Sequence, residues 1–260
     1  MIPKTIHYCW FGGNPKPEII EKCITSWKQF CPDWEIKEWN ETNYDVNALT
    51  YTKEAYEAKK WAFVTDVARL EIVNQHGGFY LDTDVEILNE MNGLLENEAI
   101  YAYETNRNIA TGLGFGAIAG HHTVTAMLND YVGRHFIING KPDLSPCPSK
   151  NTEALRKVCP EFYRNGQTQR MGGVLVLSGN DYAKVAHHHG TMSWVDGDKG
   201  SHQFKDTKLK RYLRKPTHFD WIETHLGKKA TDIYTFLVYD LLEMGPAYYI
   251  KRKINKLRKK

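Results

Sequence analysis

The chain has 260 residues, of which 42% are hydrophobic and 25% charged, and its formal net charge is +3. This is the composition of an ordinary soluble globular protein, long enough for one sizeable core. Five irregularly spaced cysteines without a C-x-x-C pair argue against a disulfide framework or a structural zinc site, so we expect a reducing compartment. There is no leader-like start and no run of 18 apolar residues, so neither a signal peptide nor a membrane span is expected.

The charge is unevenly distributed. Residues 205–260 hold 15 Lys or Arg against 6 Asp or Glu, a net of +9, so residues 1–204 carry 3 − 9 = −6. We therefore expect a main domain over 1–204 and a separate basic, helical extension over 205–260.

The first elements alternate in type. Residues 2–11 are rich in β-formers and are followed by two glycines, which predicts a strand and a turn. Apolar residues at helical spacing predict a helix over 15–30, and period-2 alternation predicts a strand over 34–39. Strand, helix and strand in this order begin a parallel sheet. Trp10, at the end of the first strand, either stacks on a nucleotide base or belongs to the core.

A second helix-rich region follows. We expect helix from about residue 52, and residues 61–76 give the strongest helical pattern of the chain, with Gly77 as its stop. Asp66 and Arg69 are three residues apart and therefore lie on one side of this helix. They form either a surface ion pair or part of a site.

The most informative stretch is 77–86. Two glycines and a short apolar run precede Asp82 and Asp84, which places two carboxylates at the carboxyl end of a strand, where α/β sheets bind ligands. Hard oxygen ligands at such an edge suit Mg²⁺ or Mn²⁺. A solvated turn is the alternative for an isolated Asp-x-Asp.

The rest of the main domain is less regular. We expect strands over 100–104 and 174–177, a helix over 122–136, and irregular, proline-rich chain over 140–159. Residues 111–120 are dense in glycine, which lets the backbone approach a ligand or another strand closely. His187, His188 and His189 are either a surface run or include one ligand of a metal already held by carboxylates.

Several ordered motifs together resemble glycosyltransferase family 32, whose sugar-binding region carries a D-x-D motif and which includes capsule and lipopolysaccharide transferases. They are I-P-K-x-I-H-x-x-W-F-G at 2–12, S-W at 26–27, P-D-W-E at 32–35, A-F-x-x-D-x-x-R at 62–69, G-G-x-Y-L-D-x-D at 77–84, and H-H with S-W at 188–194. The likeness covers residues 2 to about 194. In the family an aromatic residue usually follows the His pair, whereas Gly190 stands here.

The resemblance implies a GT-A fold, which is Rossmann-like, and a retaining hexosyl transfer from a nucleotide-sugar, with a UDP-sugar expected, to a saccharide or lipid-linked saccharide acceptor in surface polysaccharide biosynthesis. It implies a Mn²⁺ or Mg²⁺ ion held by Asp82 and Asp84 and by His188 or His189. The implied catalytic residues are Asp66, Arg69, Asp82 and Asp84. The implied substrate contacts are Trp10, Phe11, Asp66, Arg69, Asp82, Ser193 and Trp194.

Competing classes are a D-x-D phosphohydrolase, a calcium-binding loop and a basic-tail binding protein without catalysis. Glu86 stands where the phosphohydrolase motif wants Thr or Val, and Ile87 stands where a calcium loop needs Gly. The net charge of −6 over residues 1–204 would repel nucleic acid, and no nucleic-acid motif is present.

The basic end suggests a location. An apolar stretch at 233–242 is too short to span a bilayer, and residues 251–260 contain 7 cations in 10 positions with apolar residues on one side. We expect this segment to bind an anionic membrane surface, which would place the protein in the cytoplasm, peripheral to the inner face of the cytoplasmic membrane. A solvated basic end is the alternative.

Overall fold

The computed structural model describes residues 1–104, 108–190, 222, 225–226, 230 and 233–234. It contains two compact units, one of residues 1–162 and 167–196, the other of 163–166 and 197–260. The boundary expected from the sequence, between 204 and 205, lies outside the described residues. No helix among the described residues is long and apolar enough to cross a membrane.

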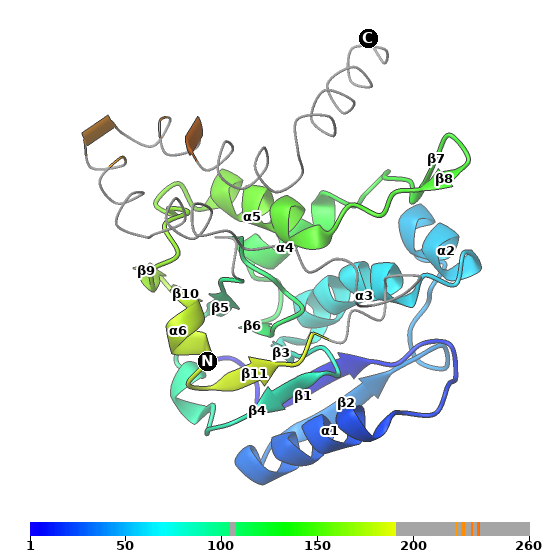
Figure 1. Ribbon diagram of the computed structural model, residues 1–260, viewed down its shortest axis with the longest axis horizontal. Coiled ribbons are helices and arrows are strands. Elements are labelled where there is room, and N and C mark those ends of the chain that lie inside the picture. The colour runs from blue at the N-terminus through cyan, green and yellow to red at the C-terminus, as the bar shows by residue number, and fades with distance from the viewer. Residues whose placement is uncertain (105–107, 191–221, 223–224, 227–229, 231–232, 235–260) are drawn as a thin grey trace, which may run out of the picture. The chain divides into compact units, whose positions relative to one another are not determined.

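The first unit is an α/β structure built on one sheet (Figure 1). The elements in chain order are β1 (Thr5–Cys9), α1 (Glu18–Phe30), β2 (Glu35–Trp39), α2 (Thr50–Glu57), α3 (Trp61–His76), β3 (Gly78–Tyr80), β4 (Val85–Ile87), η1 (Asn92–Leu94), β5 (Ala99–Ala102), β6 (Phe115–Ala117), α4 (His122–Asn129), β7 (Ile137–Ile138), β8 (Lys141–Pro142), α5 (Cys147–Val158), β9 (Gln169–Met171), β10 (Val174–Leu177), α6 (Gly179–Tyr182) and β11 (Ala186–His188).

Within residues 1–104 and 108–190, seven strands form this sheet in the order β2-β1-β3-β6-β5-β10-β9. Strands β2, β1, β3, β5 and β10 run in one direction, and β6 and β9 run against them. The expected α/β class, with a mostly parallel central sheet flanked by helices, is confirmed. Because five strands share a direction, their carboxyl ends meet at one edge, where ligands bind in such sheets.

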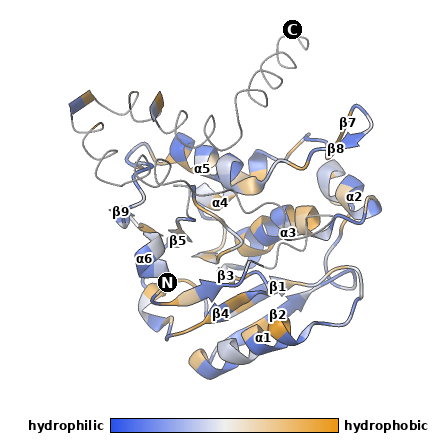
Figure 2. Ribbon diagram, viewed as in Figure 1, coloured by the Kyte–Doolittle hydropathy of each residue, from blue (hydrophilic) through white to orange (hydrophobic). Residues whose placement is uncertain are grey.

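Each face of the sheet has its own hydrophobic core. On one face α2 to α5 pack over residues such as Tyr80, Tyr101 and Phe115. On the other, α1 and the two-stranded β4–β11 sheet cover residues such as Ile6 and Phe79. Helix α1 alternates hydrophobic and hydrophilic segments along its length (Figure 2), as expected of a helix with one covered face.

Most predicted elements are found, and two of the predicted segments differ from the structure. The helix expected over 122–136 ends at Asn129. The stretch expected to be irregular, 140–159, contains the twelve-residue helix α5; that prediction was wrong because Pro148 is compatible with a first helical turn, whose N–H groups need no partner within the helix. The glycine-dense stretch contains the short strand β6, which pairs with β3 and β5.

Candidate functional site

The two carboxylates of the D-x-D motif follow β3 at the carboxyl edge of the sheet. The strand ends at Tyr80, and the amide of Leu81 still donates to the carbonyl of His7, 3.1 Å away. The amide of Asp82 donates to the carbonyl of Gly112 at 3.1 Å. The carboxylates therefore follow a strand fixed on both sides, which holds them at the ligand-binding edge.

Strand β4, after the motif, is fixed by α1. The indole N–H of Trp27 donates to the carbonyl of Val85 at 2.7 Å, and the amide of Ile87 donates to the hydroxyl of Ser26 at 2.9 Å. Both donors and acceptors are buried, so these bonds are costly to leave unmade. The Ser-Trp pair noted in the sequence thus orients the chain directly after Asp84.

Asp66, Arg69 and Asp82 form a buried ion cluster. The Nη2 atom of Arg69 lies 3.1 Å from Asp66 Oδ1 and 3.4 Å from Asp82 Oδ1. Asp66 is 8% exposed and Arg69 is 4% exposed, so the pair predicted on helix α3 is not a surface ion pair. The Asp82 side chain is 27% exposed and is the member of the cluster most open to a ligand.

Tyr80, the last residue of β3, contacts both Asp82 and Arg69. Its hydroxyl donates to Asp82 Oδ1 at 3.0 Å, and the Arg69 guanidinium lies 5.2 Å from the centre of its ring. The Nε of Arg69 donates to the carbonyl of Thr65 at 3.0 Å, which fixes the guanidinium on its own helix. Arg69 therefore has little freedom to turn away from the two carboxylates.

The charges of the cluster are strongly coupled. Burial raises the pKa values of Asp66 and Asp82, and the nearby Arg69 opposes this by favouring their ionised forms. Burial disfavours the charged form of Arg69, but Asp82 and Asp66 hold its pKa well above its ordinary value. Arg69 is thus a permanent cation facing two carboxylates in a poorly solvated place.

Cys147 was not predicted from the sequence. It opens α5, is buried, and its thiol affects the pKa of Asp66. Burial raises the pKa of Cys147 well above its ordinary value, and the charge of Asp66 adds to this, so the group is a neutral thiol. An isolated cysteine beside a proline gives no sequence signal for this contact.

The histidine run lies beside the D-x-D motif. Strand β11 pairs antiparallel with β4, with His188 opposite Val85, and the amide of His189 donates to the Asp84 carbonyl at 3.0 Å. His188 Nε2 is 3.1 Å from Asp84 Oδ1, whereas His189 Nε2 is 2.8 Å from Glu86 Oε2. The two histidines therefore have different carboxylate partners, and His187 is exposed.

Asp84 and His188 offer donors of the kinds that a divalent ion takes, one carboxylate oxygen and one imidazole nitrogen. Burial acts against the charged form of His188, but Asp84 and then Asp82 outweigh it and raise the pKa of the imidazole. Within the described residues, no group of three or more His, Cys, Asp or Glu side chains is gathered closely enough to hold a metal. The donor types fit a divalent ion, and Asp82, whose pKa is also raised by the charge of Asp84, is the other carboxylate of the motif.

The remaining predicted contacts lie elsewhere. Phe11 is buried in the core, with its ring 5.7 Å from that of Tyr44. Trp10 is half-buried, and its indole N–H donates to the Asn14 carbonyl at 2.7 Å. Ser193 and Trp194 lie outside the described residues.

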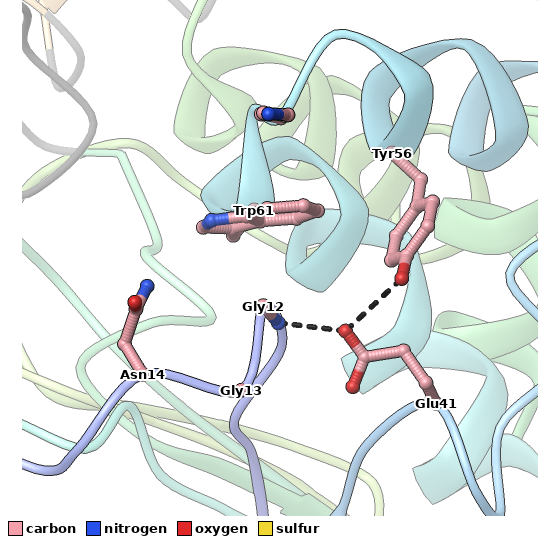
Figure 3. Close-up of a pocket in the computed structure, with 7 residues that line it drawn as sticks. Gly12, Gly13, Asn14, Glu41, Tyr56 and Trp61 are labelled. Carbon is pink, nitrogen blue, oxygen red and sulfur yellow. Dashed lines mark hydrogen bonds between the residues drawn. The ribbon is translucent and has the colours of Figure 1, made fainter.

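An open hollow of about 630 Å³ lies at the end of β1 (Figure 3). The Gly12–Gly13 turn is expected from the sequence, whereas the other residues that line this hollow are not. Trp61, the first residue of α3, lines the hollow, and Asp66 and Arg69 lie further along the same helix. It is lined by Gly12, Gly13, Asn14, Glu41, Tyr56, Lys59 and Trp61.

Comparison with known proteins agrees with this site. Residues 17–101, about a third of the chain, match the family model described as a glycosyltransferase sugar-binding region containing a DXD motif. The matched region holds α1, α3 and both carboxylates of the motif. The chain thus contains a segment similar to glycosyltransferase sugar-binding regions, and the Asp66–Arg69–Asp82 cluster lies within that segment.

Two solved structures illustrate what the fold is similar to. One is the PaToxG glycosyltransferase, 16% identical, with a TM-score of 0.48 over 61% of this chain and 70% of that chain. The other is the galactosyltransferase LgtC in complex with donor and acceptor sugar analogs, 13% identical, with a TM-score of 0.35 over 66% of this chain and 72% of that chain. A search of curated proteins gives no match.

Proposed function

We propose that the chain is a metal-dependent, retaining glycosyltransferase that moves a hexose from a nucleotide-sugar to a saccharide or lipid-linked saccharide acceptor in surface polysaccharide biosynthesis. One observation carries the proposal: a buried Asp66–Arg69–Asp82 cluster stands directly beside Asp84 at the ligand-binding edge of the sheet. A stability role alone does not require such a cluster, because burying charges costs more than burying apolar side chains of similar volume.

The two carboxylates and the guanidinium of the cluster suit different groups of a nucleotide-sugar. Asp66 and Asp82 accept hydrogen bonds only, which suits sugar and ribose hydroxyls, and Arg69 donates through a planar fork to a sugar or phosphate oxygen. The three groups hold one another in place, so little reorganisation is needed when charge develops on the departing diphosphate. The buried surroundings strengthen each of these interactions relative to water.

Asp84 and His188, with Asp82, are the residues that would hold a Mn²⁺ or Mg²⁺ ion. When bound, such an ion neutralises negative charge on the leaving diphosphate as a Lewis acid. His189 is engaged with Glu86 and is the less suitable of the two histidines.

The test is slow hydrolysis of nucleotide-sugars by the purified protein, measured across a panel of donors with Mn²⁺. We expect one donor to be hydrolysed, excess chelator to stop the reaction, and Asp84→Ala to remove it. Asp33→Ala, at an exposed carboxylate held by Lys4, is the matched control and should leave turnover unchanged. Full activity in excess chelator would contradict the proposed metal dependence.

Retention of configuration is tested separately. NMR of the freshly formed linkage should show the anomeric configuration of the donor sugar. An inverted product contradicts the retaining assignment and leaves the transferase itself intact.

We also propose that the protein works at an anionic membrane surface, in the cytoplasm. The support is the basic sequence of residues 251–260, which lies outside the described residues. A lipid-linked acceptor would be encountered at the same surface.

A further inference from the structure

The segment of residues 109–112, which leads into β6, is bonded to the sheet and to the D-x-D motif. The amide of Ala110 donates to the Ala102 carbonyl at 3.1 Å, and the Gly112 carbonyl accepts from the Asp82 amide at 3.1 Å. Ala102 is the last residue of β5, and Asp82 is the first carboxylate of the motif. The segment therefore connects the end of β5 to one carboxylate of the candidate site.

Helix α5 holds the same segment through two neighbouring side chains. The side-chain amide of Asn151 donates from Nδ2 to Thr111 Oγ1 at 3.0 Å. The backbone amide of Ile109 donates to Thr152 Oγ1 at 3.0 Å, and the Thr152 hydroxyl donates to the Pro148 carbonyl of its own helix at 2.7 Å. Two adjacent residues of α5 thus bind two alternate residues of the segment.

The bond between Asn151 and Thr111 is buried and therefore costly to lose. Thr111 is fully buried and Asn151 is 1% exposed. A buried amide that loses its acceptor keeps the cost of its removal from water, because no solvent molecule replaces the lost partner. Asn151 Oδ1 has no hydrogen-bond partner among the described residues, so Thr111 is the one partner that this side-chain amide has there.

The same segment ends against the ion cluster. A Cβ on Gly112 would collide with Asp82 Oδ2 and would lie 2.9 Å from Arg69 Nη1. The Gly112 backbone therefore limits where the Asp82 carboxylate can lie. Because Thr111 directly precedes Gly112, a bond that fixes Thr111 also restricts Gly112.

We propose that Asn151 is a positioning residue for the transfer reaction, because its bond to Thr111 holds Gly112 against Asp82 and so fixes the Asp82 carboxylate. Asn151 itself does not touch the substrate in this assignment. The inference rests on the proposed function, since it concerns a carboxylate of that same site.

Thr111→Val tests the bond, because it removes the hydroxyl and keeps the shape of the side chain. We expect kcat for donor hydrolysis by the full chain with Mn²⁺ to fall about tenfold and KM to change less, since a shift of about 1 Å in a reacting group can cost about 100-fold and a smaller shift costs less. Thr111→Ser keeps the hydroxyl and should recover most of the lost kcat. Equal kcat in Thr111→Val and the wild type overturns the inference.

Thr125→Val is the matched control, because it removes a bond of the same kind elsewhere. Thr125 Oγ1 on α4 donates to Asn74 Oδ1 on α3 at 2.8 Å, and Asn74 lies five residues beyond Arg69. This variant should lose some stability and keep its kcat. A loss of kcat in Thr125→Val as large as in Thr111→Val would show that the effect follows stability and would overturn the positioning role.

A double variant, Thr111→Val with Asn151→Leu, separates positioning from stability. Replacing both partners of a buried bond by apolar groups of similar shape is nearly neutral, so the free energy of unfolding should return toward that of the wild type. We expect kcat to stay about tenfold low, because no hydrogen bond then joins Thr111's position to α5. Recovery of kcat together with stability overturns the role of the bond.

Hydrogen exchange at the Asp82 amide, followed by NMR, needs no turnover. This amide is bonded to the Gly112 carbonyl, so it should exchange about tenfold faster in Thr111→Val than in the wild type, and at the wild-type rate in Thr125→Val. Equal exchange in Thr111→Val and the wild type overturns the inference. A wild-type protein that hydrolyses no donor contradicts the proposed function instead, and the exchange rates then decide by themselves whether Asn151 holds the segment.

Discussion

Arg69 lies between two carboxylates in a place with little water, and this arrangement has a cost. Removing charged groups from water is expensive, and their attraction offsets this only where geometry and hydrogen bonding are good. Here the guanidinium is fixed by the Thr65 carbonyl and by contacts with Asp66 and Asp82. The cluster is therefore already arranged for a polar ligand before one binds.

The role of Asp66 can be tested by a neutral isostere. We expect Asp66→Asn to lower kcat/KM about 10- to 100-fold, because a hydrogen bond to a charged group is worth about 1.5–3 kcal/mol. The fold should persist, since Arg69 keeps Asp82 as partner. Circular dichroism and unfolding in urea check the fold.

The control for this variant is Glu153→Gln, at a 50% exposed carboxylate paired with Arg156 on α5. Exposed pairs of this kind contribute little, so turnover and stability should both stay close to those of the wild type. Unchanged turnover in Asp66→Asn would show that the buried Asp66–Arg69 pair has only a structural role.

His7 shows how a single titratable group sets acid stability. It is 2% exposed; its Nε2–H donates to the Gly77 carbonyl at 2.9 Å, and its Nδ1 accepts from the Trp39 indole at 3.1 Å. Burial lowers the pKa of His7 to about 4, although the bond to Gly77 opposes the shift. The imidazole is therefore neutral in the folded protein at neutral pH.

The consequence is a loss of stability in acid. The unfolded chain, with a His pKa of 6.5, binds the proton between pH 6.5 and 4 while the folded chain does not, so the free energy of unfolding falls as pH drops through this range. The His7 contribution amounts to about 3 kcal/mol. Urea unfolding at several pH values should show a correspondingly smaller acid loss in His7→Gln, and equal losses in both proteins would contradict the assignment.

At the scale of elements, the loop before β6 is pressed against the ion cluster. A Cβ on Gly112 would collide with Asp82 Oδ2 and lie 2.9 Å from Arg69 Nη1. The Gly112 carbonyl also accepts from the Asp82 amide at 3.1 Å. The glycine thus lets the loop touch the cluster without displacing it.

We expect Gly112→Ala to shift the Asp82 carboxylate and to lower kcat/KM about 100-fold, since a displacement of about 1 Å can cost that much. Stability should fall by about 1–3 kcal/mol, as for other overpacked sites. Gly93→Ala is the control, because an added Cβ there meets no atom within 4 Å. A fully active Gly112→Ala enzyme would show that Asp82 tolerates the shift.

Elements with strong local signals could be predicted, and contacts between distant segments could not. Helix α3 has a continuous apolar pattern and a glycine stop, so its bounds agree with the sequence prediction. Helix α5 buries the polar residues Asn151 and Thr152 together with Ala154 and Leu155, and it begins among prolines, so an apolar pattern alone did not predict it. The different partners of His188 and His189 depend on the pairing of β11 with β4, which no local pattern specifies.

At the scale of the whole molecule, the sequence separates an acidic body from a basic end. We expect truncation after Pro246 to abolish salt-dependent binding to anionic vesicles, because each cation near such a surface contributes about 1 kcal/mol. Activity on a soluble acceptor should be retained. Co-sedimentation with anionic and with neutral vesicles measures the difference, and equal binding by the truncated and intact proteins refutes the anchor.

The antiparallel pairing of β11 with β4 affects when the site can form during synthesis. His189 and Glu86 are 103 residues apart in the chain, yet their side chains meet beside the D-x-D motif. At roughly 5–20 residues per second, a ribosome needs about 5–20 s to pass from one to the other. During that interval the nascent chain already contains both motif carboxylates but not the imidazole that faces Asp84. A prematurely terminated product would therefore keep both carboxylates of the motif and lack His188, which faces Asp84.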